Sequence, residues 1–233
     1  KRFNILSLMR ILAVSDIHND VENIITYTDK ISFINFDVIV LLGDFTDYNL
    51  PKGFEAKDIG ELIIEEFKTF KKPMLAIPGN FDRDLIELFK EKGINLHGEG
   101  KIIENIGFYG FGGARTPFHT PLEPSENEIE EGLKKGYEKV KNCEVKVQVT
   151  HVPPFNSKVD IAYTGAHIGS EAVRKFIENY KPKVAICSHV HEARGLDEIE
   201  TTKIINPGRF PEGYCGIIDV INGKVDVKII SLI

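Results

Sequence analysis

Five short apolar runs, each followed closely by an Asp, Asn or His residue, constrain this chain more than any other feature of its sequence. Runs of aliphatic residues such as residues 11–14 are typical of strands that are buried on both faces, as in a parallel sheet. Side chains that follow such strands meet at one edge of an open α/β sheet, and binding sites form there. The runs at 11–14, 38–42, 74–77, 145–150 and 184–187 lead into Asp16 and His18, Asp44, Asn80, His151, and His189 with His191, respectively.

Stretches with the spacing of amphipathic helices separate most of these runs. The first half of the chain therefore alternates between strand and helix, which predicts parallel strands joined by crossover helices and an α/β fold. The second half is richer in strands, and Asn222-Gly223 predicts a tight hairpin turn. We predict helices at residues 21–33, 56–70, 84–91, 126–140 and 170–179. We predict strands at residues 10–15, 37–42, 74–77, 101–104, 107–112, 144–150, 183–188, 202–205, 214–221 and 224–230.

The length of 233 residues is enough to bury a sizeable core and fits one α/β domain over residues 1–233. Residues 1–8 are a candidate N-terminal extension, with Met9 as a candidate natural start. The formal net charge of −6 disfavours binding to long nucleic acid or to an anionic membrane surface. A polyanionic partner would need a local positive centre, which bound divalent metal ions could supply.

The three cysteines, Cys143, Cys187 and Cys215, form no Cys-x-x-Cys pair, and the last two lie in a strand-like apolar context. We expect buried, reduced thiols rather than metal ligands, which indicates a reducing compartment. The sequence has no apolar run near the roughly 18 residues that a membrane helix needs. Residues 1–8 are too short and too poor in small residues for a signal peptide. These features together predict a cytoplasmic protein.

The residues at the predicted strand ends each have an ordinary alternative role. Asp44 alone could form a turn, Asn80 could cap a helix, and His151 could be a polar loop residue. As a set they favour a metal site, because Asp16 and His18 on extended backbone would aim both side chains at one point. The set offers three acidic or amide oxygen donors and four imidazoles, which is too many for one tetrahedral zinc ion. It fits two metal ions that share a bridging carboxylate.

The order Asp-x-His, Gly-Asp, Gly-Asn, His and His-x-His resembles the calcineurin-like metallophosphoesterases, and among them the small prokaryotic phosphodiesterases. The resemblance extends from Asp16 to His191. It implies a four-layer α-β-β-α sandwich with a dinuclear metal centre at the strand ends. It implies one metal ion held by Asp16, His18 and His191, a second held by Asn80, His151 and His189, and Asp44 as the bridge. It also makes Asn80 and His151 the expected catalytic residues.

Mixed nitrogen and oxygen ligands suit Mn²⁺, Fe, Zn²⁺ or Ni²⁺, and of these we favour Mn²⁺. Two such ions activate a bridging hydroxide and offset charge on the phosphoryl group. Together with the resemblance to the small phosphodiesterases, this predicts a hydrolase of small phosphodiesters. The chain departs from many relatives at Phe81, where they have a histidine that helps to protonate the leaving group; Asp82 remains beside it. Losing a general acid typically costs about 10²–10⁴ in rate. We therefore expect slow turnover, leaving groups that need little protonation, or another acid.

Phe81 also keeps a second hypothesis open, in which the chain is a non-catalytic, metal-binding interaction module of the same fold. The complete ligand set argues against this hypothesis, because a site without a catalytic role is free to lose its metal ligands. A small phosphoester is the predicted partner, and homo-oligomer formation stays open. Arg115 and His119 in the loop at 112–119, and His167 before a predicted helix, are candidate substrate contacts. Their alternatives are solvated loop residues and, for His167, helix capping.

Overall fold

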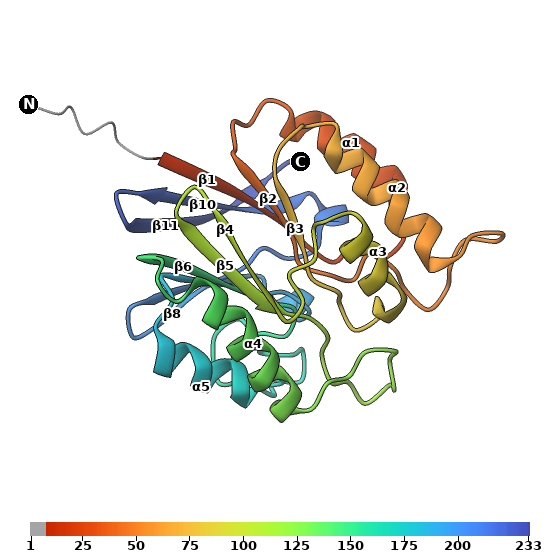
Figure 1. Cartoon of the computed structure of the whole chain (residues 1–233). Coiled ribbons are helices and arrows are strands. Elements are labelled where there is room, and N and C mark those ends of the chain that lie inside the picture. The colour runs from red at the N-terminus through yellow and green to blue at the C-terminus, as the bar shows by residue number, and fades with distance from the viewer. Residues whose placement is uncertain (1–7) are drawn as a thin grey trace, which may run out of the picture.

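The computed structural model describes residues 8–233, and its centre is a pair of β-sheets packed face to face (Figure 1). The first sheet has five strands in the order β11-β10-β1-β2-β3, and the second has six in the order β4-β5-β6-β7-β9-β8. The strands are β1 (Leu8–Val14), β2 (Val38–Leu41), β3 (Met74–Ala76), β4 (Glu99–Ile103), β5 (Ile106–Phe111), β6 (Val145–Thr150), β7 (Val184–Ile186), β8 (Gly195–Ile199), β9 (Thr202–Asn206), β10 (Tyr214–Ile221) and β11 (Lys224–Ser231).

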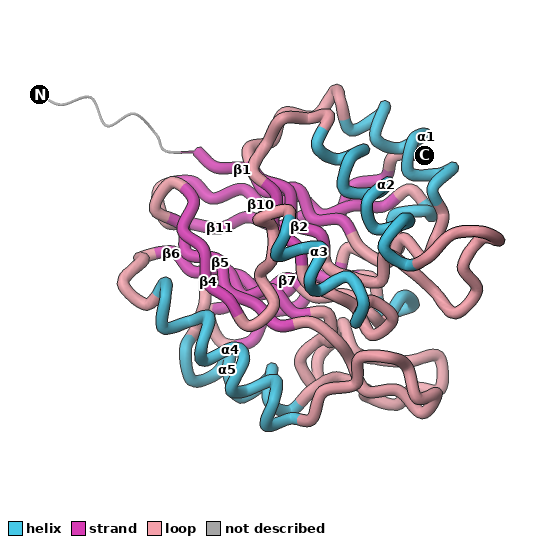
Figure 2. The backbone as a smooth tube through the Cα atoms, turned by 45° about the vertical axis from the view of Figure 1, so that its right-hand side comes forward, coloured by secondary structure: helices cyan, strands magenta, loops and turns pink. Residues whose placement is uncertain are grey.

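The helices lie on the outer faces of the two sheets (Figure 2). They are α1 (Val21–Ile31), α2 (Ala56–Lys68), α3 (Ile86–Glu91), α4 (Glu126–Val140) and α5 (Glu171–Tyr180). Helices α1, α2 and α3 cover the first sheet, whereas α4 and α5 cover the second. Across residues 8–233, no helix combines the length and the apolar character needed to cross a membrane.

Alternating side chains along the strands build the layers of the core, because successive side chains point to opposite faces of a sheet. In β1, Ile11 and Ala13 pack between the two sheets, whereas Leu12 and Val14 pack under the helices of the first sheet. The buried strands of the second sheet divide in the same way between the inner layer and the layer under α4 and α5. These layers form an α-β-β-α sandwich, which confirms the predicted fold class.

Parallel pairing in both sheets follows the predicted crossover pattern. Strands β1, β2 and β3 are parallel neighbours, as are β5, β6, β7 and β9. The remaining strands pair antiparallel, and β10 and β11 form a hairpin in which Ile221 pairs with Lys224. The two turn residues, Asn222 and Gly223, both have positive φ, as the predicted tight turn requires.

One strand was not predicted, and several element ends differ from the prediction. Strand β8 lies at the edge of the second sheet, beside β9, and carries Asp197 and Glu198. Edge strands commonly carry charge, so β8 lacks the apolar signal that marks the inner strands. Strand β1 begins at Leu8, two residues before the predicted start at residue 10. The rest of the predicted extension lies outside the described residues, and the single domain over 1–233 stays a prediction.

His97 anchors the start of the loop that follows β5. Its ring stacks on Phe111 with centroids 4.1 Å apart, and its Nδ1 accepts a hydrogen bond from the amide of Gly112 at 2.9 Å. Burial, with the charges of Lys90 and Lys135, lowers the pKa of His97 to about 4. The neutral ring is therefore the form that the fold stabilises.

We predict that His97 contributes stability that is complete above pH ~6.5 and is lost as the pH falls towards 4, because its pKa is lower in the folded state than in the unfolded state. Urea unfolding of the parent and of His97→Gln should show a difference in unfolding free energy that shrinks by on the order of 2 kcal/mol between pH 7 and pH 4.5. A difference that stays constant over this range would contradict the prediction.

Candidate metal centre

The loops after β1, β2, β3, β6 and β7 converge at one end of the two sheets and carry all seven predicted metal ligands. Two clusters of side chains there could each hold a metal ion. The first contains Asp16, His18 and His191, and the second contains Asp44, His151 and His189. In each cluster the candidate ligand atoms lie within 4.8 Å of one another.

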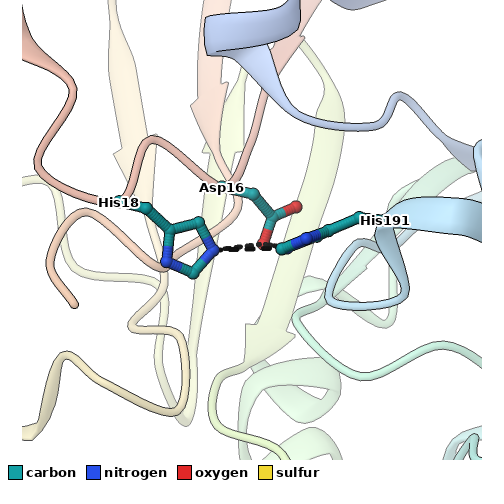
Figure 3. A group of neighbouring side chains, drawn as sticks. All are labelled: Asp16, His18 and His191. Atoms are coloured by element: carbon teal, nitrogen blue, oxygen red, sulfur yellow. Dashed lines mark hydrogen bonds and ion pairs between the residues drawn. The ribbon is translucent and has the colours of Figure 1, made fainter. Parts of the chain in front are cut away.

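The three side chains of the first cluster point toward one another (Figure 3). His18 Nε2 lies 3.2 Å from His191 Nε2, and Asp16 Oδ1 lies 3.3 Å from His191 Nε2 and 3.9 Å from His18 Nε2. Asp16 is fully buried, and its Oδ1 accepts no hydrogen bond from any residue in 8–233. A buried carboxylate oxygen without a donor is costly, so this arrangement of donors fits a cation.

In the second cluster, His151 Nε2 lies 3.3 Å from Asp44 Oδ2 and 3.2 Å from Asn80 Oδ1. The ring of His189 lies beside that of His151, with centroids 5.2 Å apart. Asp44 Oδ2 also lies 3.7 Å from His18 Nε2, which belongs to the first cluster. Asp44 therefore stands between the clusters, where a bridging ligand has to be. The seven side chains are brought together as the resemblance implies, and their role as metal ligands stays a prediction.

The backbone at the strand ends differs from the expectation for Asp16 and His18. Both have left-handed φ, 54° and 50°, rather than extended backbone, so strand alternation does not explain their convergence. Asp44 and His189 also have positive φ, at 50° and 72°. Non-glycine residues adopt this conformation at a cost that the surrounding structure has to offset. Backbone hydrogen bonds offset part of this conformational cost. The amides of Asp16 and His18 donate to the carbonyls of Gly43 and Asp44, at 3.1 and 2.9 Å.

Two glycines allow the loops after β2 and β3 to touch beside the metal ligands. A Cβ at Gly79 would lie 2.0 Å from Asp44 Oδ1, and a Cβ at Gly43 would lie 2.3 Å from the backbone nitrogen of Gly79. Both separations are far below van der Waals contact. Because the loops approach so closely, the amide of Phe81 donates to Asp44 Oδ1 at 3.1 Å and fixes that carboxylate.

Asp82 joins these two loops and is unsuited to the acid role that its sequence position left open. Its carboxylate is fully buried and accepts hydrogen bonds from the amides of Phe45, Thr46 and Gly79, at 3.1, 3.1 and 2.8 Å. Burial and the charge of Asp44 raise the pKa of Asp82 to about 6. The carboxylate is committed to holding the loops together, so it does not replace a proton donor at Phe81.

Partners on the far side of the imidazoles fix their orientation, and the sequence analysis did not identify them. His151 Nδ1 lies 2.7 Å from the carbonyl oxygen of Leu42 and 2.9 Å from Ser188 Oγ. His18 Nδ1 lies 3.3 Å from Asp47 Oδ2. In both histidines Nε2 therefore faces the site, as is usual for metal-binding imidazoles. The available signals were an acid three residues after Asp44 and a serine next to His189.

The protonation of the second cluster also fits cation binding. Burial lowers the pKa of His151, but the charge of Asp44 and its contact with the ring outweigh that effect and raise it to about 9. Burial and the charge of His151 lower the pKa of His189 to about 4, so that ring is neutral at pH 7, as a metal-binding imidazole has to be. A divalent ion can replace the proton of His151 as the partner of Asp44.

A cleft of about 630 Å³ opens above the two clusters. Arg115 lines this cleft, together with Phe81 and the side chains of several neighbouring loops. His119 and His167 are not among its lining residues, and His167 Nδ1 instead lies 2.6 Å from the buried Asp160 Oδ1. The geometry thus places one of the three candidate substrate contacts at the cleft and gives no support to the other two.

Two clusters of candidate carboxylate and imidazole ligands at the strand ends of such a fold are the arrangement expected of a metal-dependent hydrolase. Residues 9–193 match the calcineurin-like phosphoesterase family. An uncharacterized protein of Methanocaldococcus jannaschii, MJ1162, is 34% identical over 215 residues, which cover 88% of this chain and 90% of that protein. The chain therefore belongs to the calcineurin-like phosphoesterase family, whose members use two metal ions.

Two solved structures share the fold. The TT1561 protein of Thermus thermophilus has a TM-score of 0.70 and 19% identity, with 95% of this chain and 99% of that chain covered. A structure described as a novel archaeal phosphodiesterase has a TM-score of 0.54 and 18% identity, with 95% of this chain and all of that chain covered. At this level of identity the likeness concerns the fold alone.

We predict that the parent protein binds two Mn²⁺ ions per chain and that Asp44→Asn weakens the binding of both. Even the loss of an outer contact typically costs about 10–100-fold in metal affinity, so removal of a shared carboxylate should cost at least tenfold. Isothermal titration calorimetry of metal-stripped protein measures both quantities. Asp226→Asn, an exposed change on β11, is the matched control. Unchanged affinity for one of the ions in Asp44→Asn would show that Asp44 does not bridge.

Proposed function

We propose that this phosphoesterase hydrolyses small phosphodiesters with two divalent ions, of which Mn²⁺ is the favoured one, and that it does so in the cytoplasm. The observation that carries the proposal is the complete set of seven candidate ligand side chains, five of which line one cleft while Asp16 and His151 are buried behind it. Asp16, His18 and His191 would hold one ion, Asn80, His151 and His189 the other, and Asp44 both. A non-catalytic module would not need to keep such a set.

The cleft supports a diester over a monoester. A diester carries substituents on two sides of the phosphorus, so it needs room beyond the position of a single leaving group. The cleft has a volume of about 630 Å³, and Pro117, Ile168 and Val190 give it apolar walls beyond the metal ligands. Apolar walls favour organic ester groups over a solvated phosphoryl oxygen.

Bound metal ions supply an activated water and offset the charge that develops on the phosphoryl oxygens. The residues of the chain supply orientation. Leu42 and Ser188 hold the imidazole of His151, and Asp47 faces that of His18, so that both Nε2 atoms aim at the site. Arg115 places a guanidinium at the cleft, where it can bind a phosphoryl oxygen.

Protonation of the leaving group is the catalytic step that this site supports least. Phe81 lines the cleft and has no proton to donate, and Asp82 is buried in the joint between two loops. Leaving groups that are stable as anions need little protonation, so aryl esters suit the site better than alkyl esters.

We predict metal-dependent hydrolysis of bis(p-nitrophenyl) phosphate at a higher kcat/KM than that of p-nitrophenyl phosphate. Metal-stripped protein should be inactive, and Asp44→Asn should lose at least about 10²-fold in kcat, because the ligand placed to bind both ions is gone. Release of p-nitrophenolate measures both. Faster turnover of the monoester would contradict the diester preference. Two bound ions with no turnover of either ester would instead favour the non-catalytic module.

We predict that Phe81→His accelerates the hydrolysis of esters with poor leaving groups. An imidazole here can donate a proton to the departing oxygen, so kcat/KM for methyl phenyl phosphate should rise by about tenfold or more. The gain for methyl p-nitrophenyl phosphate should be smaller, because its leaving group is stable as an anion. Phe81→Leu, which lacks both the ring and a proton donor, should not raise either rate. Equal gains for the two substrates would contradict the explanation.

A further inference from the structure

Three aromatic side chains line one side of the cleft and are not used by the metal clusters. These are Tyr48 from the loop after β2, Phe81 from the loop after β3, and Phe118 from the loop after β5. Tyr48 and Phe118 are 57% and 72% exposed, which is high for large apolar side chains. Single exposed aromatics are ordinary, but three that line one cleft above the predicted metal ligands form an apolar surface suited to binding a ligand.

In this aromatic wall, two of the rings are in contact, and the third is carried by a loop that is tied to one of them. The rings of Tyr48 and Phe81 meet edge to face, with centroids 4.7 Å apart and an interplanar angle of 82°. The hydroxyl of Tyr48 donates to the carbonyl oxygen of Phe118 at 3.1 Å and so ties two of the loops together. Phe81 also meets the ring of His18 edge to face, with centroids 5.8 Å apart. The wall therefore begins directly beside the first metal cluster.

The loop that carries Phe118 is itself anchored. One carboxylate oxygen of Glu123 accepts hydrogen bonds from Thr116 Oγ1, from the amide of Thr120 and from Thr120 Oγ1, at 2.6, 2.7 and 2.8 Å. The amide of Leu122 donates to the carbonyl oxygen of Asn80 at 2.9 Å, which joins this loop to a predicted metal ligand. The backbone of the loop that carries Phe118 is thus held beside the predicted metal centre by its own hydrogen bonds.

Arg115 adds a positive charge to the cleft, which suits the negative charge of a phosphoryl group. It is exposed, it lines the same cleft, and it makes no ion pair with any carboxylate of residues 8–233. The predicted metal ions and Arg115 together favour a phosphoryl group at the floor of the cleft. The aromatic wall then faces whatever group the phosphoryl oxygen carries. Planar rings pack edge to face or offset against such walls more favourably than saturated groups of the same size.

We propose that the wall of Tyr48, Phe81 and Phe118 selects phosphoesters that carry a planar aromatic group, either a nucleobase or a simple aryl group. This inference rests on the proposed phosphoesterase site and names its class of substrate. The aromatic group lies against the wall while the phosphoryl group lies at the metal centre. The apolar area and the ring contacts lower the dissociation constant for aromatic esters, whereas the metal centre contributes equally to the binding of aromatic and saturated esters.

Calorimetric binding of phosphonates to the Mn²⁺-loaded protein tests the proposal without requiring turnover. Phenylphosphonate and cyclohexylphosphonate carry the same headgroup and substituents of similar size, so they differ mainly in planarity and aromatic character. We expect the phenyl compound to bind about five- to tenfold more tightly. Phe118→Ala and Phe81→Leu should each reduce that ratio, whereas Phe33→Ala, an exposed phenylalanine away from the cleft, should preserve it.

Equal affinity for the two phosphonates overturns the proposal, as does an unchanged ratio in both cleft variants or a failure to bind either compound. The affinities for thymidine 5′-monophosphate and ribose 5-phosphate are then compared, to distinguish a nucleobase from a simple aryl group. A preference for the nucleotide indicates a nucleobase, and its absence beside a phenyl preference indicates a simple aryl ester. Diester hydrolysis without a phenyl preference refutes the proposed role of the aromatic wall and leaves the proposed reaction standing. A phenyl preference without diester hydrolysis refutes the proposed reaction alone.

Discussion

The burial of two carboxylates at the same point is the constraint on which the rest of this structure depends. Asp16 and Asp44 are 0% and 2% exposed, and the charge of each raises the electrostatic cost of keeping the other ionised in the interior. Four imidazoles surround them, and Asp16 Oδ1 still lacks a hydrogen-bond donor among residues 8–233. Such a cluster of carboxylates and imidazoles fits a binding site for cations. The fold therefore supplies a scaffold rigid enough to hold like charges together.

That rigidity comes from loops rather than from strands alone. The strands of the two sheets bring five chain segments to one end of the molecule, but left-handed backbone and close glycine contacts set the final directions. Asp82 illustrates the principle. Its buried carboxylate collects amides from the loops after β2 and β3 and fixes the distance between Asp44 and Asn80. The side chain that stands beside Phe81 as a candidate acid belongs to the framework instead.

The sequence was sufficient to predict an α/β fold, most elements and the set of side chains at the strand ends, because buried parallel strands have a strong local signal. The four-layer sandwich was implied by the family resemblance. Strand β8 was missed because an edge strand with Asp197 and Glu198 lacks that signal. The left-handed backbone at Asp16 and His18, and the partners of the imidazoles such as Ser188, depend on contacts between distant segments. The aromatic wall likewise joins three loops, so no local pattern marks it.

The central claim is that the two clusters hold a pair of metal ions bridged by Asp44. Anomalous diffraction at the manganese edge from crystals of the Mn²⁺-loaded protein tests it most directly. The account predicts two peaks roughly 3.5–4 Å apart, one among Asp16, His18 and His191 and one among Asn80, His151 and His189, with Asp44 in contact with both. A single peak, or two ions that share no contact with Asp44, would contradict it.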